Sequence, residues 1–146
     1  MRREIVRLRE AEPWFVAAST AFEAIQAGQA TDADWEAITP FTYGRWDAAA
    51  RAHQANGDKQ RNEQVAAVFG SDGAFDPTVT RAALATLGRR CCCLAGSSTW
   101  QRRPSVVAKL AGLFPHATLV IQPGGGHCPW LDDPVWFTPT IAAFLE

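Results

Sequence analysis

Four segments near the C-terminal end of the sequence alternate between two hydrophobic patterns, and their order restricts the fold more than any other feature. Residues 91–95 and 117–121 are short apolar runs beside glycine or proline, which is typical of buried strands. Segments 104–114 and 134–145 each begin with proline and place apolar residues at helical spacing. A helix that connects two strands of one sheet makes the strands parallel. The order therefore predicts a βαβα unit, which is an α/β fold with a small parallel sheet.

A glycine-rich turn follows the second predicted strand and leads to a histidine. Gln122 and Pro123 are followed by three glycines, at 124–126, and then by His127. The glycines allow a sharp turn and leave little side-chain bulk beside the histidine. Histidine is the side chain best suited to transfer a proton near neutral pH. His127 is therefore the leading candidate for a functional residue.

The first 88 residues are predicted to form consecutive helices. Thr31 and Asp76 are suitable N-caps, and Asp58 is expected to cap a helix after the Asn56-Gly57 turn. Helices are expected over 14–28, 31–39, 43–56, 58–69 and 77–88. We therefore divide the chain into a helical region, residues 1–88, and an α/β region, residues 89–146.

Charge and cysteine usage disfavour several classes of protein. Fourteen basic and fifteen acidic residues give a formal net charge of -1, which does not favour nucleic acid as a partner. No apolar run approaches the ~20 residues that span a membrane, and the first residues lack the apolar stretch of a signal peptide. Three of the four cysteines are consecutive, unlike a secreted disulfide framework. We expect reduced thiols and a cytoplasmic protein without a membrane or nucleic-acid partner.

In their order, the C-terminal segments resemble the last part of an α/β-hydrolase of the serine esterase and peptidase type. Segment 110–115, the strand, the glycine turn, His127, Asp133-Pro134 and a final amphipathic helix follow the family order. The resemblance implies that residues 1–88 are the helical cap and that residues 89–146 are the C-terminal βαβα part of an incomplete hydrolase fold. It implies an ester or amide substrate, which is a small molecule, and no cofactor.

The same resemblance implies roles for individual residues. His127 is the general base, which deprotonates a serine and later protonates the leaving group. Thr99, in Gly96-Ser97-Ser98-Thr99, stands where the family usually has the triad acid. Trp14, Phe41, Trp46 and Trp130 are candidates for substrate contacts; the alternative is that the first three are core aromatics and that Trp130 lies in a packed loop. Apart from the resemblance, the position of Asp133 before Pro134 predicts a helix N-cap.

Two parts of the family's active site are missing from the sequence. No G-x-S-x-G motif occurs, so no nucleophile or oxyanion loop is assigned. Thr99 cannot stabilise an imidazolium as a carboxylate does. Asp132 and Asp133 lie close to His127 in the sequence and are carboxylates that could replace the acid, but they need favourable geometry to reach its imidazole. We therefore expect a truncated form, or one that is inactive alone, which retains the triad histidine.

A shift of reading frame is one hypothesis for these departures. With suitable codons, the DNA for 88–93 read from one base before the Arg89 codon encodes Ala-Pro-Val-Leu-Leu, a typical family strand. The same shift over 96–99 encodes Glu-Leu-Asp, which supplies the acid. The DNA sequence tests this hypothesis, because incompatible codons would exclude it.

Two other chemistries remain open from the sequence. Cys91, Cys93, Cys128 and His127 are potential ligands of a metal site or members of a thiol site, since alternate strand residues share a face. Ser97 or Ser98 is a potential replacement for the missing nucleophile, because adjacent parallel strand ends lie together. Metal analysis and serine labelling with a fluorophosphonate separate these alternatives.

A non-catalytic role is the remaining alternative. In this case the helical region is an interaction module, or the chain is the complementing subunit of a separate chain that carries the serine. Two parallel strands alone leave unpaired edges and apolar faces. We therefore expect a complementing N-terminal half or self-association.

Overall fold

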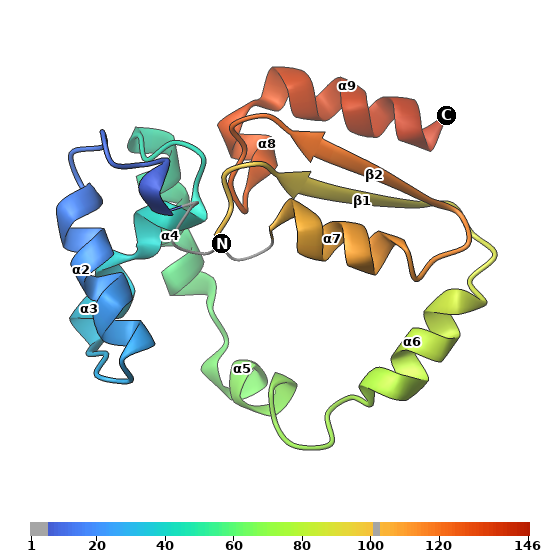
Figure 1. The fold of residues 1–146 in the computed structure, drawn as a ribbon, viewed down its shortest axis with the longest axis horizontal. Helices are drawn as coiled ribbons and strands as arrows, with labels where there is room; N and C mark the ends of the chain where they lie inside the picture. The colour runs from blue at the N-terminus through green and yellow to red at the C-terminus, as the bar shows by residue number, and fades with distance from the viewer. Residues whose placement is uncertain (1–5, 101–102) are drawn as a thin grey trace.

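The chain forms a helical N-terminal part, an extended helical arm and an α/β unit; the computed structural model describes residues 6–100 and 103–146 (Figure 1). The predicted change from helices to a strand–helix–strand–helix order is confirmed. None of the helices in these ranges is long and apolar enough to cross a membrane. The N-terminal part contains α2 (Phe15–Gln26), α3 (Asp32–Ala37), η1 (Thr39–Thr42) and α4 (Ala48–Gln60), and the arm contains α5 (Glu63–Phe69) and α6 (Pro77–Ala85). The α/β unit contains β1 (Cys91–Gly96), α7 (Pro104–Ala111), β2 (Ala117–Gln122), α8 (Pro129–Asp132) and α9 (Pro134–Leu145).

A cluster of aromatic side chains holds the N-terminal helices together. Phe22 of α2 and Phe41 of η1 are buried, and the ring of Trp14 meets that of Phe41 edge to face at 5.1 Å. The predicted N-cap Thr31 forms a capping box with Asp34, which fixes the start of α3. Trp100, which follows β1, packs against Phe22 at 5.6 Å. The chain beyond β1 is therefore anchored in the helical part.

The predicted boundaries around α4 are wrong. Asp47 caps α4, and the helix continues through Asn56-Gly57 to Gln60. Gly57 does not adopt the positive φ that would end a helix there, unlike Gly28, with a φ of 72°. Asp58 therefore lies inside α4 and does not begin a new helix; its side chain is outside the described part of the structure. Asn62 caps the following helix, α5.

The arm buries little of its apolar surface. Asp76 caps α6 as predicted, and its carboxylate accepts hydrogen bonds from the amides of Thr78 and Val79. The apolar residues expected to pack on one face of these helices remain exposed. Phe69 of α5 is 81% exposed, and Val79 of α6 is 64% exposed. In Figure 1, α5 and α6 form an arc below α7, and α6 leads back to the start of β1.

The two strands pair in parallel, as predicted, with Cys91 opposite Ala117 and Gly96 opposite Gln122. Helices α7 and α9 lie on opposite sides of this small sheet (Figure 1). The guanidinium of Arg90 donates to the carbonyl of Phe144 at 2.9 Å and stacks on its ring, which ties the end of α9 to the start of β1.

The expectation of two buried strands is wrong for β2. Three of its six residues are exposed, Ile121 by 43%, and only Gln122 is buried. The reason is geometric: a sheet of two strands has two open edges, and two helices cannot cover both faces completely. The described α/β unit is therefore an open fragment of sheet.

Candidate functional site

Three backbone segments meet at the carboxyl end of the strands. A Cβ atom on Gly96 would overlap the carbonyls of Gly125 and Gly126, and one on Gly126 would overlap the backbone around Gly44. Gly124 has a φ of 67°, in the region that favours glycine. The glycines therefore allow the end of β1, the turn at 123–126 and the segment before α4 to come into direct contact.

Backbone hydrogen bonds join this turn to the end of β1. The amide of Ser97 donates to the carbonyl of Gln122, and that of Ser98 donates to the carbonyl of Gly125, both at 2.9 Å. The hydroxyl oxygen of Ser97 accepts from the amide of Gly124 at 2.8 Å. Ser97 thus stabilises the turn that precedes His127.

Asp132 joins the turn to the helical part. Its Oδ2 accepts from the amide of Gly126 at 2.6 Å, and its Oδ1 accepts from the amides of Gly44 and Arg45 at 2.9 and 3.2 Å. The residue is only 8% exposed. Both carboxylate oxygens therefore serve backbone amides, while Asp133 caps α9 through the amide of Trp136, as predicted.

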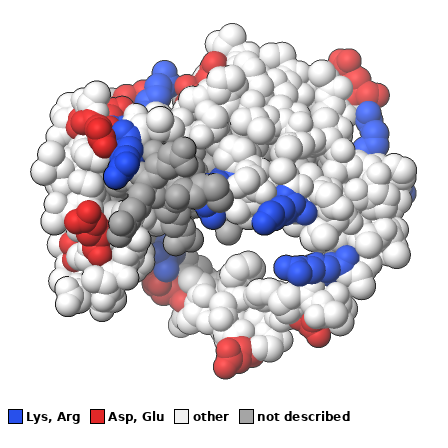
Figure 2. All heavy atoms as spheres, in the orientation of Figure 1, with Lys and Arg blue, Asp and Glu red and all other residues white. Residues whose placement is uncertain are grey.

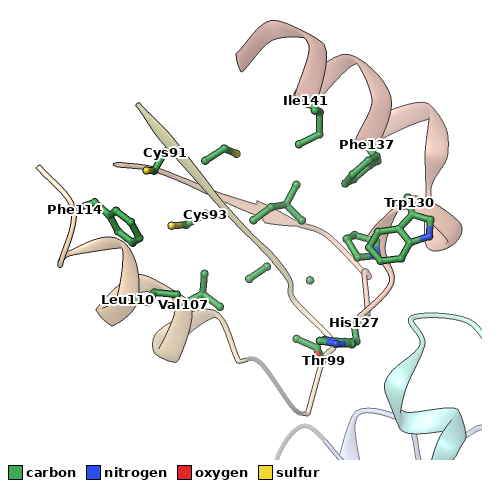
Figure 3. A pocket seen from close by; sticks show the side chains of 16 residues that line it. Cys91, Cys93, Thr99, Val107, Leu110, Phe114, His127, Trp130, Phe137 and Ile141 are labelled. Atoms are coloured by element: carbon green, nitrogen blue, oxygen red, sulfur yellow. The ribbon is translucent and has the colours of Figure 1, made fainter. Parts of the chain in front are cut away.

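His127 and Thr99 lie together at the carboxyl ends of the two strands. The backbone amide of His127 donates to the carbonyl of Thr42 at 2.6 Å, which holds the residue against the helical part. Thr99 is 1% exposed, whereas the side chain of His127 is exposed. Figure 3 shows the two side chains next to each other at one end of a cavity. The structure thus brings together the two residues to which the resemblance assigns the base and the acid position.

The cavity of about 740 Å³ runs from this pair along β1, between α7 and α9 (Figure 3). Every residue of β1 contributes to its lining, with Val107, Leu110 and Phe114 on one side and Phe137 and Ile141 on the other. No Asp, Glu, Lys or Arg occurs among its described lining residues. On the face in Figure 2, the Lys and Arg side chains are scattered among uncharged residues. The cavity is therefore an apolar space with His127 at one end.

Burial favours the protonated form of three of the four cysteine thiols. Burial raises the pKa of the thiols of Cys92, Cys93 and Cys128, with a smaller contribution from neighbouring thiols at Cys93 and from Asp132 at Cys128. A raised pKa keeps these thiols protonated at neutral pH. No three His, Cys, Asp or Glu side chains in ranges 6–100 and 103–146 are arranged to hold a metal ion. The alternative metal site of Cys91, Cys93, Cys128 and His127 is therefore not assembled.

The tryptophans and phenylalanine predicted to contact substrate are not together. Trp14 and Phe41 belong to the aromatic cluster of the helical part, and Trp46 packs against Tyr43 in a second, smaller cluster. Only Trp130 of these four lines the cavity among the described residues, and its ring lies 6.2 Å from that of Phe137. Trp14 and Phe41 therefore hold the helical part together, and Trp46 packs against the cluster that joins Tyr43 to Cys128.

Two components of the site have no direct signal in the sequence. In the sequence, the lining residues of α7 and α9 are part of the apolar pattern of two amphipathic helices. This pattern predicts the helices but not the cavity between them. The role of Asp132 depends on Gly44, 88 residues away, and an isolated Tyr43-Gly44 pair does not reveal it. Comparison of the chain with known proteins found no matching family model, no matching curated protein and no matching solved structure.

Proposed function

We propose that this chain carries the histidine end and the helical cap of an α/β-hydrolase-type acyl-transfer site and acts together with a separate chain that supplies the serine. The observation that supports this most is the meeting of His127 and Thr99 at the carboxyl ends of adjacent parallel strands, beside an apolar cavity. Sites in open α/β sheets lie at the carboxyl ends of the strands. In this proposal the substrate is a small ester or amide.

The proposed role of His127 is that of a general base. Its imidazole takes the proton of the serine hydroxyl as the oxygen attacks the acyl carbon, and it returns the proton to the leaving group. The backbone bond to Thr42 and the Asp132 contacts fix the position of the residue, while its exposed side chain stays accessible. Such positioning is what general-base catalysis requires of an enzyme.

The serine must come from outside the described residues in this proposal. The oxygen of Ser97 already accepts a backbone hydrogen bond in the turn, and neither Ser97 nor Ser98 stands on a strand-to-helix elbow. A fluorophosphonate reagent is therefore expected to leave the isolated chain unlabelled. Rapid labelling of Ser97 or Ser98 in the chain alone would contradict this part of the proposal.

The test of the function is reconstitution. The chain is mixed with the separately expressed N-terminal half of an α/β-hydrolase that carries a G-x-S-x-G motif, and complex formation is measured by sedimentation. Labelling of the serine by the fluorophosphonate is expected in the complex. His127→Ala is expected to slow labelling by a factor on the order of 100 to 10,000, the usual contribution of a general base.

His116→Ala is the control for this experiment. His116 is exposed in the loop before β2, and only its backbone carbonyl bonds to β1. Labelling in this variant is expected to match that of the unsubstituted chain. A complex that labels equally fast with and without the His127 imidazole would disprove the proposal.

Thr99→Asp is expected to accelerate ester hydrolysis by the same complex on the order of 100-fold or more, since a carboxylate in this position stabilises the imidazolium. Thr99→Asn has nearly the same shape without the charge and is expected to give no such gain. The rates are compared with a chromogenic ester. Equal rates for the Asp and Asn variants would show that position 99 does not act on His127.

A further inference from the structure

One edge of β1 faces away from β2 and pairs with no other strand of the described residues. The amide of Cys91 donates to the carbonyl of His116, and that of Ser97 donates to the carbonyl of Gln122. Since alternate residues of a strand direct their N–H and C=O groups to the same side, the backbone groups of Cys92, Leu94 and Gly96 point away from β2. The sheet has only β1 and β2 in the described part of the chain. The three outward residues therefore offer their backbone groups to another strand.

This edge lacks the features that normally prevent strand addition. Natural edge strands carry charged residues, proline or bulges. β1 has the sequence Cys-Cys-Cys-Leu-Ala-Gly and pairs with β2 in unbroken register. An unprotected edge of this kind is typical of a strand that is covered in the working protein.

The apolar cavity encloses the same edge. Consecutive strand residues face opposite sides of a sheet, and all six residues of β1 line the cavity, so the cavity extends around the edge and onto both faces. Leu110 of α7 borders it on one side and Ile141 of α9 on the other (Figure 3). The edge consequently lies at the bottom of a groove between two helices.

We propose that this groove binds an extended, uncharged segment of a partner protein, which adds to β1 as a further strand. Its backbone pairs with Cys92, Leu94 and Gly96, and its apolar side chains point alternately toward α7 and α9. β1 has six residues and is about 20 Å long at 3.3 Å per residue, so the segment has about six residues. The inference does not depend on the chemistry proposed for His127.

The shape and charge of the groove favour this occupant over two others. A small apolar molecule would leave the regularly spaced N–H and C=O groups of the edge unpaired, whereas a strand satisfies them. In a second copy of this chain, β1 is flanked by its own α7 and α9. A second copy therefore brings two more helices to the groove, whereas an extended segment brings only one backbone to the pairing distance of about 4.8 Å. The absence of charged residues from the described lining excludes a charged segment, because a buried charge needs a partner.

The experiment measures binding of a fluorescent peptide to the whole chain by anisotropy. The peptide has the core Val-Leu-Val-Ala-Val-Leu, with two lysines at each end for solubility. Two further peptides carry N-methyl groups on core positions 1, 3 and 5 or on positions 2, 4 and 6. One methylated peptide is expected to bind on the order of 100-fold more weakly, because it loses three backbone hydrogen bonds. The other is expected to bind like the unmodified peptide.

Two protein variants complete the test. Cys92→Lys places a charge in the groove and is expected to weaken binding at least tenfold. Thr118→Lys adds the same charge at an exposed position of β2 and is expected to leave binding unchanged. Slow exchange of the amides that join β1 to β2 shows that both variants are folded. Absence of peptide binding, equal binding of the two methylated peptides, or a dimer of the chain that does not take up the peptide would overturn the proposal.

Discussion

Asp132→Ala is expected to lower the free energy of unfolding by about 4 kcal/mol, because it leaves buried backbone amides without an acceptor. The carboxylate accepts hydrogen bonds from Gly126, Gly44 and Arg45 and is itself almost fully buried. Alanine removes both oxygens, and the crowded glycine backbones leave little room for water to replace them. Urea denaturation followed by circular dichroism measures the change.

Asp133→Ala is the matched control for this variant. Asp133 also accepts a backbone hydrogen bond, from Trp136, but it is exposed and acts as an N-cap, so its loss is expected to cost only about 1 kcal/mol. The difference between the two losses of unfolding free energy measures what the hydrogen bonds of Asp132 to Gly126, Gly44 and Arg45 contribute beyond ordinary helix capping. Similar losses for both variants would show that Asp132 does not join the turn to the helical part.

Local signals account for the parts of the fold that the sequence predicts well. The helix from Pro134 to Leu145 has an N-cap, an initial proline and a consistent apolar pattern, and the structure contains it with these bounds. Thr31 and Asp76 likewise cap the helices expected after them. Each of these signals lies within a few residues of the element it defines, so no knowledge of tertiary contacts is needed.

Predictions failed where a local signal competed with tertiary structure. Asn56-Gly57 is a common turn, but here both residues continue α4, and the break comes at Asn62, which caps the following helix. The apolar pattern of β2 indicated burial, whereas its actual exposure depends on how many strands and helices surround it. The hydrophobic pattern therefore predicted that β2 is a strand, but it did not predict how far its side chains are buried.

The candidate site was partly predictable for a similar reason. The glycine turn and His127 are adjacent in sequence, and parallel pairing is enough to bring the end of β1 beside them. The same pairing places Thr99, which lies just after β1, next to His127. The hydrogen bond from the Gly44 amide to Asp132 was not predictable in this way. It forms only when the helical part packs on the turn, and this packing depends on contacts between residues far apart in the chain.

The close approach of backbones at Gly96 makes this glycine the most sensitive position at the end of the strands. Gly96→Ala is expected to cost about 3 kcal/mol of folding free energy, since its Cβ would overlap the carbonyls of Gly125 and Gly126 and neither is a flexible side chain that could turn aside. Relief requires the turn to move away, which also weakens the bond from the Ser98 amide to Gly125. Thermal and urea unfolding measure the loss.

Gly112→Ala provides the control for Gly96→Ala. Gly112 has a φ of -64°, and the nearest atoms to an added Cβ are carbonyl oxygens at 3.6 Å, an ordinary contact distance. This substitution is expected to be neutral or to stabilise the protein by about 0.5 kcal/mol, because alanine restricts the unfolded chain. A loss at Gly96 no larger than that at Gly112 would mean that the end of β1 and the glycine turn are not in contact. His127 would then lack the fixed position next to Thr99 on which its proposed role as a general base depends.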